Sequence, residues 1–197
     1  LPDGESDGRR LAVWLAGVHD IGKATPAFAS RRAPLAEPMR RQGLQMCDQY
    51  PKADLKQTLH GIAGQILLER WLADVHGWTR RRSRQIAVVV AGHHGVPPTT
   101  SEILAAESHL GLLGLRDSQR TWRVVQRELL DQAASQYGVN DRLPHWADVA
   151  LSQPGQVLLT ALVIVADWIA SNEDLFPYDL ETLSSPTRIA RAWEKLD

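Results

Sequence analysis

Apolar residues recur at intervals of three and four along most of the chain, which is the pattern of amphipathic α-helices. Residues 54–75 show it most clearly, and Asp54 is a suitable N-cap for that helix. Residues 80–92 and 117–137 repeat the pattern. Residues 154–172, PGQVLLTALVIVADWIASN, are the most apolar of all. We therefore predict that this last segment is the central, buried helix.

Shorter helices are predicted in three places: residues 9–19, 25–30 and 186–196. The second of these has Thr25 as its N-cap and Pro26 at its first helical position. Residues 31–53 contain three prolines and scattered charges, so we expect a loop there. The sequence thus predicts one all-α domain over residues 1–197, without an internal boundary.

Composition narrows the setting of this domain. Cys47 is the only cysteine, so an intramolecular disulfide is impossible and a cytoplasmic location is expected. No uninterrupted apolar run reaches the ~18 residues of a membrane span, and we expect no membrane partner. The polar start, LPDGESDGRR, is unlike a signal peptide and resembles a loop in the middle of a protein.

Charge is distributed unevenly between the two halves of the chain. Residues 1–100 carry 14 Lys and Arg against 9 Asp and Glu, whereas residues 101–197 carry 8 against 14. The basic clusters of the first half are Arg31–Arg32, Arg40–Arg41, Arg80–Arg82 and Arg84. Each cluster fits either a solvated surface or a surface for a polyanion.

Candidate chemistry begins where the apolar run LAVWLAGV ends in His19 and Asp20. Neighbouring residues in a helix point ~100° apart and do not readily share one ion. At a helix end, where Gly22 relaxes the backbone, they could instead bind adjacent ions. A carboxylate has two oxygens and can bridge two metals, while an imidazole binds one. A His-Asp pair alone is weak evidence.

Four further residues strengthen this interpretation: His60, His93, His94 and Asp167. His60 lies within the predicted helix 54–75, and the two adjacent histidines follow the helix 80–92 between glycines. Asp167 interrupts an apolar helix, where an unpaired ionised carboxylate costs on the order of several kcal/mol. It therefore needs a buried cationic side chain, a metal ion or an exposed helix face. Together, in this order, the motifs indicate a metal site.

The motifs HDIGKATPAF, LHGIAGQ, AGHHG and ADWIASN resemble the HD-domain superfamily of metal-dependent phosphohydrolases. More narrowly, they are similar to the HD nuclease domain of the nuclease-helicases of type I CRISPR systems. The resemblance extends from about residue 9 to residue 175. It implies an HD-type helical bundle with a two-metal site between its helices.

The resemblance also implies a role for each residue. One metal ion would be held by His19, Asp20 and Asp167, and the other by His60, His93 and His94, with Asp20 bridging them. Asp20, Lys23 and Ser171 would take part in catalysis, Lys23 facing the substrate phosphate and Ser171 lying near the scissile bond. The family has a further metal-binding histidine upstream, and no histidine precedes His19 here. We therefore expect the first helix to be absent and the first site to be weak or empty.

Imidazole and carboxylate ligands without thiolates favour two divalent transition-metal ions, Fe, Mn, Co or Ni before Zn, and Mg least. Family resemblance makes the expected reaction hydrolysis of single-stranded DNA during CRISPR interference. The implied partners are a superfamily 2 helicase domain, absent from this chain, and the CRISPR surveillance complex. Two alternatives stay open: an HD phosphohydrolase of a small nucleotide, such as a deoxynucleoside triphosphate or cyclic dinucleotide, and a non-enzymatic helical module with structural histidines.

Overall fold

The computed structural model describes residues 1–177 and 185–196, and it contains helices and no strand within those ranges. The α-helices are α1 (Gly4–Val18), α2 (Pro26–Ala29), α3 (Ala33–Arg41), α4 (Lys52–Gln57), α5 (His60–Asp74), α6 (Arg80–Ala91), α7 (Thr100–Glu107), α8 (Leu110–Leu113), α9 (Arg120–Gln136), α10 (Leu143–Trp146), α11 (Gln153–Ala170) and α12 (Ser185–Leu196). Three short 3-10 helices join them: η1 (Ile21–Lys23), η2 (Gly92–His94) and η3 (Asp117–Gln119). The all-α prediction is confirmed.

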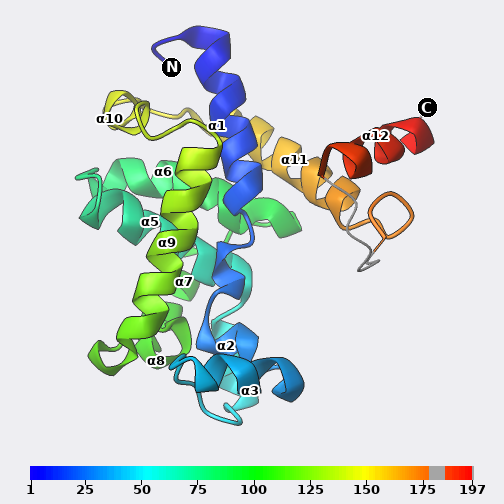
Figure 1. Cartoon of the computed structure of the whole chain (residues 1–197). Coiled ribbons are helices and arrows are strands. Elements are labelled where there is room, and N and C mark those ends of the chain that lie inside the picture. Colours follow the sequence, from blue (N-terminus) through cyan, green and yellow to red (C-terminus); the bar gives the residue numbers. More distant parts are fainter. Residues whose placement is uncertain (178–184, 197) are drawn as a thin grey trace.

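The core lies between α5 and α6, which pack along each other, with α1 and α9 side by side across them (Figure 1). Residues 61–69 of α5 are buried all round, as expected of a helix at the centre of a domain. Leu68, Leu72 and Val90 are fully enclosed, and the ring of Trp14 on α1 lies 6.0 Å from that of Trp71 on α5. The central helix is therefore α5.

The predicted helix 54–75 is wrong in one respect, because it divides into α4 and α5. Leu59 has an extended backbone (φ −56°, ψ 145°) and is the N-cap of α5, so Asp54 lies inside α4 instead. Apolar spacing could not reveal this break, since the period continues across it. Its consequence is that His60 is the first residue of a helix rather than a residue in its interior.

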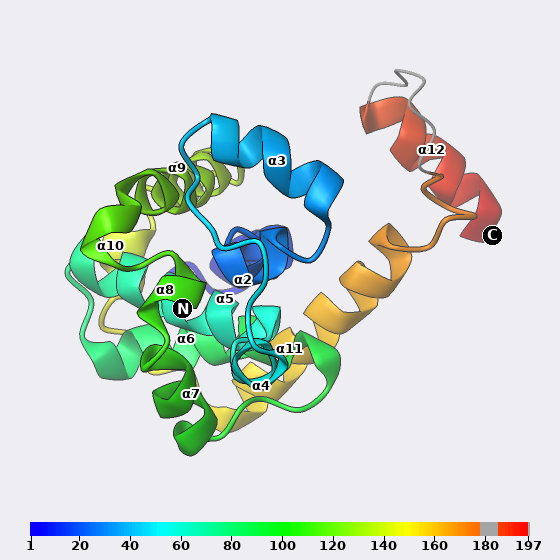
Figure 2. The same ribbon diagram turned by 90° about the horizontal axis from the view of Figure 1, so that it is seen from below.

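The predicted loop 31–53 is also wrong in part, because it contains helix α3. Pro34 occupies the first turn of α3, where a missing N–H costs nothing. Pro38 lies further inside, but the helix is short and buries only Ala36. Figures 1 and 2 show α3 at the outer edge of the molecule, where little packing depends on its regularity.

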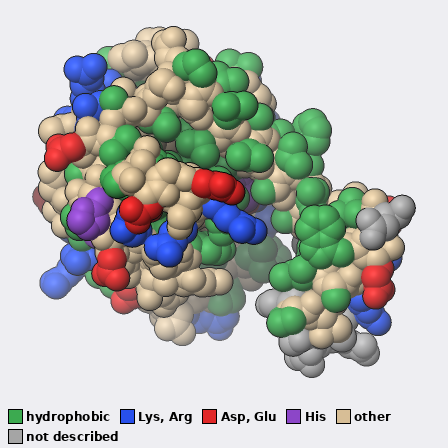
Figure 3. Space-filling view, turned by 90° about the horizontal axis from the view of Figure 1, so that it is seen from above, with side chains coloured by type: hydrophobic (Ala, Val, Ile, Leu, Met, Phe, Trp, Pro, Cys, Tyr) green, Lys and Arg blue, Asp and Glu red, His purple; other side chains and the backbone are tan. Residues whose placement is uncertain are grey.

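The prediction that 154–172 forms the central buried helix is wrong. Only Val163 of α11 is buried, while several of its large apolar side chains are more than half exposed: Val157, Leu158, Leu162 and Trp168. Hydrophobic side chains cover the surface that leads from the body of the molecule toward the end carrying α12 (Figure 3). By length and composition, α11 is the one described helix that could span a membrane.

One ion pair ties the start of the chain to the segment before α10. The guanidinium of Arg142 donates two hydrogen bonds of 2.9 Å to the buried carboxylate of Asp7 and a third to Asp3. The hydrogen bonding from Arg142 is the largest influence on the pKa of Asp7. It outweighs the effect of burial and holds this pKa well below its usual range. Asp7 is thus charged in the folded protein at any pH near neutrality.

Candidate metal centre

The first two candidate ligands stand where α1 ends. His19 is the C-cap of α1, so the predicted end of this helix is confirmed, and Asp20 is the N-cap of η1. The expected loop at residues 1–10 is wrong, because α1 already begins at Gly4. Gly22 lets η1 lie directly against the start of α5: a Cβ atom at this position would be 1.8 Å from the carbonyl oxygen of His60. That contact is with backbone, so no side-chain rotation could relieve it. The glycine therefore brings the His-Asp pair beside His60.

The histidines approach from three elements, and two are oriented by carbonyl groups. His19 Nδ1 donates to the carbonyl of Ala16 at 2.6 Å, and His93 Nδ1 donates to the carbonyl of Val90 at 2.5 Å. Because a carbonyl only accepts, each Nδ1 carries the proton, and the neutral ring presents the Nε2 lone pair. Such backing of a ring by a carbonyl is the usual outer support of a metal-binding histidine.

The first group of potential ligands consists of His19, Asp20 and Asp167. Nε2 of His19 lies 3.4 Å from Oδ2 of Asp20 and 3.3 Å from Oδ1 of Asp167. Asp167 belongs to the inner side of α11, one and two turns beyond Val163 and Thr160, and Thr160 packs against Gly92. These three donor atoms lie within 4.8 Å of one another, close enough to hold one ion.

The second group consists of His60, His93 and His94. Nε2 of His60 lies 3.2 Å from Nε2 of His93 and 2.9 Å from Nε2 of His94. His93 is buried, whereas His94 is exposed at the edge of the site. These three nitrogens also lie within 4.8 Å of one another. The two adjacent histidines can share one group because η2 turns more tightly than an α-helix.

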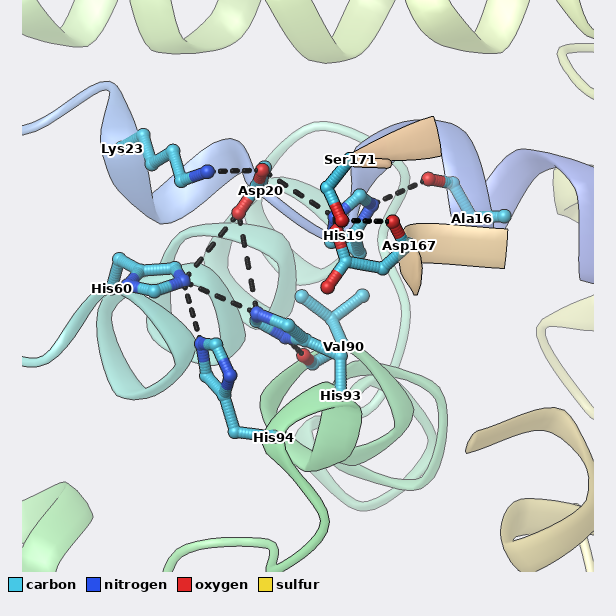
Figure 4. A network of polar contacts seen from close by, with 10 residues as sticks. All are labelled: Ala16, His19, Asp20, Lys23, His60, Val90, His93, His94, Asp167 and Ser171. Atoms are coloured by element: carbon cyan, nitrogen blue, oxygen red, sulfur yellow. Dashed lines mark hydrogen bonds and ion pairs between the residues drawn. The ribbon is translucent and has the colours of Figure 1, made fainter. Parts of the chain in front are cut away.

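The carboxylate of Asp20 lies between the two groups (Figure 4). Its Oδ2 faces His19, while its Oδ1 lies 3.5 Å from Nε2 of His60 and 4.0 Å from Nε2 of His93. One oxygen is thus directed at each group, the arrangement required for a ligand that bridges two ions. The structure brings all six predicted ligand positions together, although they come from four separate stretches of the chain: the junction of α1 and η1, the start of α5, η2, and α11.

The electrostatics of the site suit a cation. Burial lowers the pKa of His60 to about 4 and also lowers that of His93, so both rings are neutral near pH 7. Burial alone would lower the pKa of His19 too, but Asp20, the Ala16 carbonyl and the charge of Asp167 together raise it. Burial likewise raises the pKa of Asp20, yet His19 and Lys23 hold it well below its usual range.

One nitrogen of the His19 ring has no hydrogen-bonding partner among the described residues. This Nε2 atom is buried and makes no hydrogen bond to any described residue, even though two carboxylates are near. Buried polar atoms are nearly always satisfied. A metal ion would accept the lone pair of this nitrogen and neutralise both carboxylates. The donor set, four imidazoles and two carboxylates without a thiolate, therefore fits divalent metal ions.

Lys23 and Ser171 lie beside the candidate metal ligands. Lys23 Nζ donates to Oδ2 of Asp20 at 2.5 Å, and its side chain is 44% exposed. The hydroxyl of Ser171 donates to the carbonyl of Asp167 at 2.6 Å (Figure 4). Both positions are open to a substrate, and their catalytic roles stay predictions. Two further residues, Phe28 and Arg31, lie near Lys23 at the same edge. The sequence placed Phe28 in the HDIGKATPAF motif and Arg31 in a basic cluster, but it did not connect either residue to the metal site.

An all-α bundle with a His-Asp pair, three further histidines and a helical aspartate around one site is an HD-type domain. Comparison with known proteins is consistent with this class. Residues 1–176 match the family described as Cas3, HD domain. The chain belongs to this family, which confirms the resemblance found in its motifs.

Two curated relatives and one solved structure are similar to the chain. It is 34% identical over 190 residues to a CRISPR-associated nuclease/helicase Cas3 of Streptococcus thermophilus, covering 88% of this chain and 19% of the relative. It is 32% identical over 169 residues to a CRISPR-associated endonuclease/helicase Cas3 of Thermus thermophilus, covering 85% and 17%. A crystal structure of a CRISPR-associated protein matches with a TM-score of 0.69 and 30% identity, covering 94% and 20%. The chain thus spans about a fifth of the length of these proteins.

Proposed function

We propose that this domain is a metal-dependent nuclease that hydrolyses phosphodiester bonds of single-stranded DNA during type I CRISPR interference. The observation that carries the proposal is the position of Asp20, with one carboxylate oxygen directed at each of two groups of metal-ligand side chains. Relatives that share this domain are named nuclease/helicase and endonuclease/helicase.

Two divalent transition-metal ions, Fe, Mn, Co or Ni before Zn or Mg, suit this donor set. When bound, such a pair supplies an activated water molecule and positive charge at the phosphate oxygens. His19, Asp20 and Asp167 would hold one ion, and His60, His93 and His94 the other. Each group presents three side chains.

The remaining residues would act on the phosphate directly. Lys23 is exposed and neutralises Asp20 in the free protein, so a bound phosphate would compete with Asp20 for the ammonium group. Its charge would then stabilise negative charge that builds on the phosphate oxygens. Ser171 lies on the opposite side, next to Asp167, where its hydroxyl could bind an oxygen of the substrate.

Features outside the site support a polyanionic substrate. The basic half of the chain contributes five of the six candidate ligands, and only Asp167 comes from the acidic half. Attraction to phosphates is largely independent of sequence and suits backbone recognition along a strand. In the whole protein we propose a superfamily 2 helicase domain and the CRISPR surveillance complex as partners, in the cytoplasm.

The test is cleavage of circular single-stranded DNA by protein stripped of metal and reloaded separately with Mn, Co, Ni, Fe or Zn. Asp20→Asn keeps the shape of the side chain but removes the bridging charge. Asp74→Asn is the matched control, because Asp74 is exposed at the far end of α5, ~21 Å along the helix from His60. We expect nicking by the wild type and the control, and none by Asp20→Asn.

Elemental analysis of the same samples separates the other outcomes. Bound metal without cleavage of DNA, together with hydrolysis of a deoxynucleoside triphosphate or a cyclic dinucleotide, would replace the nuclease by a nucleotide phosphohydrolase. Absence of bound metal under every loading condition would refute the two-metal proposal. Equal activity of Asp20→Asn and Asp74→Asn would show that the bridging carboxylate has no part in the reaction.

A further inference from the structure

Phe28 connects the candidate metal centre to two cationic side chains. Its ring lies edge-on to that of His60, with centroids 5.7 Å apart and planes at 70°. The guanidinium carbon of Arg31 lies over the Phe28 ring, 5.1 Å from its centroid, and Nζ of Lys23 lies 5.7 Å from the same point. Cations within about 6 Å of an aromatic centroid are attracted to it. Phe28 therefore places both charges beside a metal ligand.

The position of Phe28 is fixed by the backbone around it. Thr25 is buried, and its hydroxyl donates to the carbonyl of Gly22 at 2.8 Å, which joins the start of α2 to η1. Gly22 in turn lies against the carbonyl of His60. Pro26 and Ala27 are buried in the first turn of α2. The ring is thus attached to the same surface that holds the His-Asp pair, rather than to a separate loop.

Arg31 differs from Lys23 because Arg31 is not engaged in an ion pair with any described residue. Lys23 forms an ion pair with Asp20, whereas no ion pair of Arg31 is found within residues 1–177 and 185–196. Arg31 is exposed, so its guanidinium is open to solvent. Stacking on a ring restrains the plane of a guanidinium and leaves its N–H groups directed outward. Such a group is ready to accept an anion.

We propose that Arg31, held on Phe28, forms a phosphate subsite for the nucleic-acid strand, next to the metal centre and separate from the phosphate that is cleaved. The inference rests on the proposed nuclease function and adds a contact for a neighbouring backbone phosphate. A planar guanidinium can bind two phosphate oxygens at once, which orients the strand as well as attracting it. Phe28 is a positioning residue, because it acts through Arg31 and His60.

The experiment compares Arg31→Gln with Arg32→Gln. The adjacent Arg32 is also exposed, so the control removes the same charge, but the guanidinium found over the Phe28 ring is that of Arg31. Binding of a fluorescent single-stranded oligonucleotide is measured by anisotropy, with metal-stripped protein, over a range of salt concentrations. We expect Arg31→Gln to weaken binding about three- to tenfold and to reduce the salt slope by roughly 0.7, and Arg32→Gln to change both much less.

Two further measurements make the proposal specific. Phe28→Leu keeps an apolar side chain but removes the aromatic face. We expect this substitution to weaken binding more when Arg31 is present than when it is combined with Arg31→Gln. Metal content should equal that of the wild type in Arg31→Gln. Equal effects of the two glutamine variants would overturn the subsite. Binding is measured without metal, so it does not depend on cleavage. If the nuclease proposal failed, cleavage would be absent, but the affinities of Arg31→Gln and Arg32→Gln could still be compared.

Discussion

Gly22→Ala is the substitution that tests most directly how the fold assembles the metal centre. The added methyl group would lie 1.8 Å from the carbonyl oxygen of His60 and 2.6 Å from the amide nitrogen of Gly64. Both neighbours are backbone atoms at the start of α5, which is buried all round between residues 61 and 69. Ordinary contact begins near 3.4 Å, so η1 must move away from α5 by roughly 1.5 Å.

This displacement has two measurable consequences. Overpacking of a tight contact costs about 1–3 kcal/mol, so we expect the free energy of unfolding to fall by this amount in urea titrations. Asp20 precedes Gly22 by two residues and would move with η1, which lengthens its 3.5 Å contact with His60. A misplacement of about 1 Å can cost on the order of a hundredfold in catalysis. We therefore expect fewer bound metal ions and much slower cleavage.

Gly8→Ala is the matched control for this variant. Gly8 lies inside α1, the helix that precedes η1, and a Cβ atom there would meet nothing within 4 Å. Alanine is favoured over glycine inside a helix, so we expect this control to gain about 0.5–1 kcal/mol and to bind metal normally. If Gly22→Ala matched Gly8→Ala in metal content, cleavage rate and free energy of unfolding, the close packing of η1 on α5 would not be what positions the site.

The remaining predictions concern a ligand, the core and the N-terminal ion pair. Asp167→Asn should bind one metal ion fewer per chain by elemental analysis, while the exposed Asp148→Asn should not; equal metal contents would remove Asp167 from the ligand set. Leu68→Ala, at a fully buried position, should lower the free energy of unfolding by about 2–5 kcal/mol in urea, and a loss below about 1 kcal/mol would contradict its place in the core. Because Arg142 depresses the pKa of Asp7 in the folded state, their pair stabilises the protein above the unfolded carboxyl pKa of about 3.9. That contribution should be lost as pH falls below this value, so thermal melts of Asp7→Asn should vary less with acid pH than those of the wild type, and parallel curves would refute the linkage.

Local chemistry in the sequence was sufficient for the helix content and for the residue types of the site. The apolar spacing predicts helices over most of α1, α6 and α9, and the structure has helices there. The prediction succeeds because the buried side of a helix must repeat every three to four residues. The order of His19–Asp20, His60, His93–His94 and Asp167 indicates a metal site from the sequence alone, since two of the motifs adjoin glycine and one interrupts an apolar helix.

Hydrophobicity failed where burial depends on neighbours rather than on the residue itself. α11 is the most apolar helix, yet its outer face, including Leu158 and Trp168, is exposed. The less apolar α5 occupies the centre, because it is in contact with α6, α7, α9 and the two 3-10 helices η1 and η2. A helical period states which side of a helix is apolar. It does not state how many elements cover that side.

The break between α4 and α5 shows the same limit at the site. Apolar positions continue across Leu59, so the sequence by itself determined a helix here but not its first residue. Only tertiary packing decided that α5 begins at His60, where η1 meets its backbone through Gly22. The sequence thus determined which ligand types are available, through their chemistry. The tertiary structure decided that one oxygen of Asp20 faces each group, because that distance is set by contacts between segments far apart in the chain.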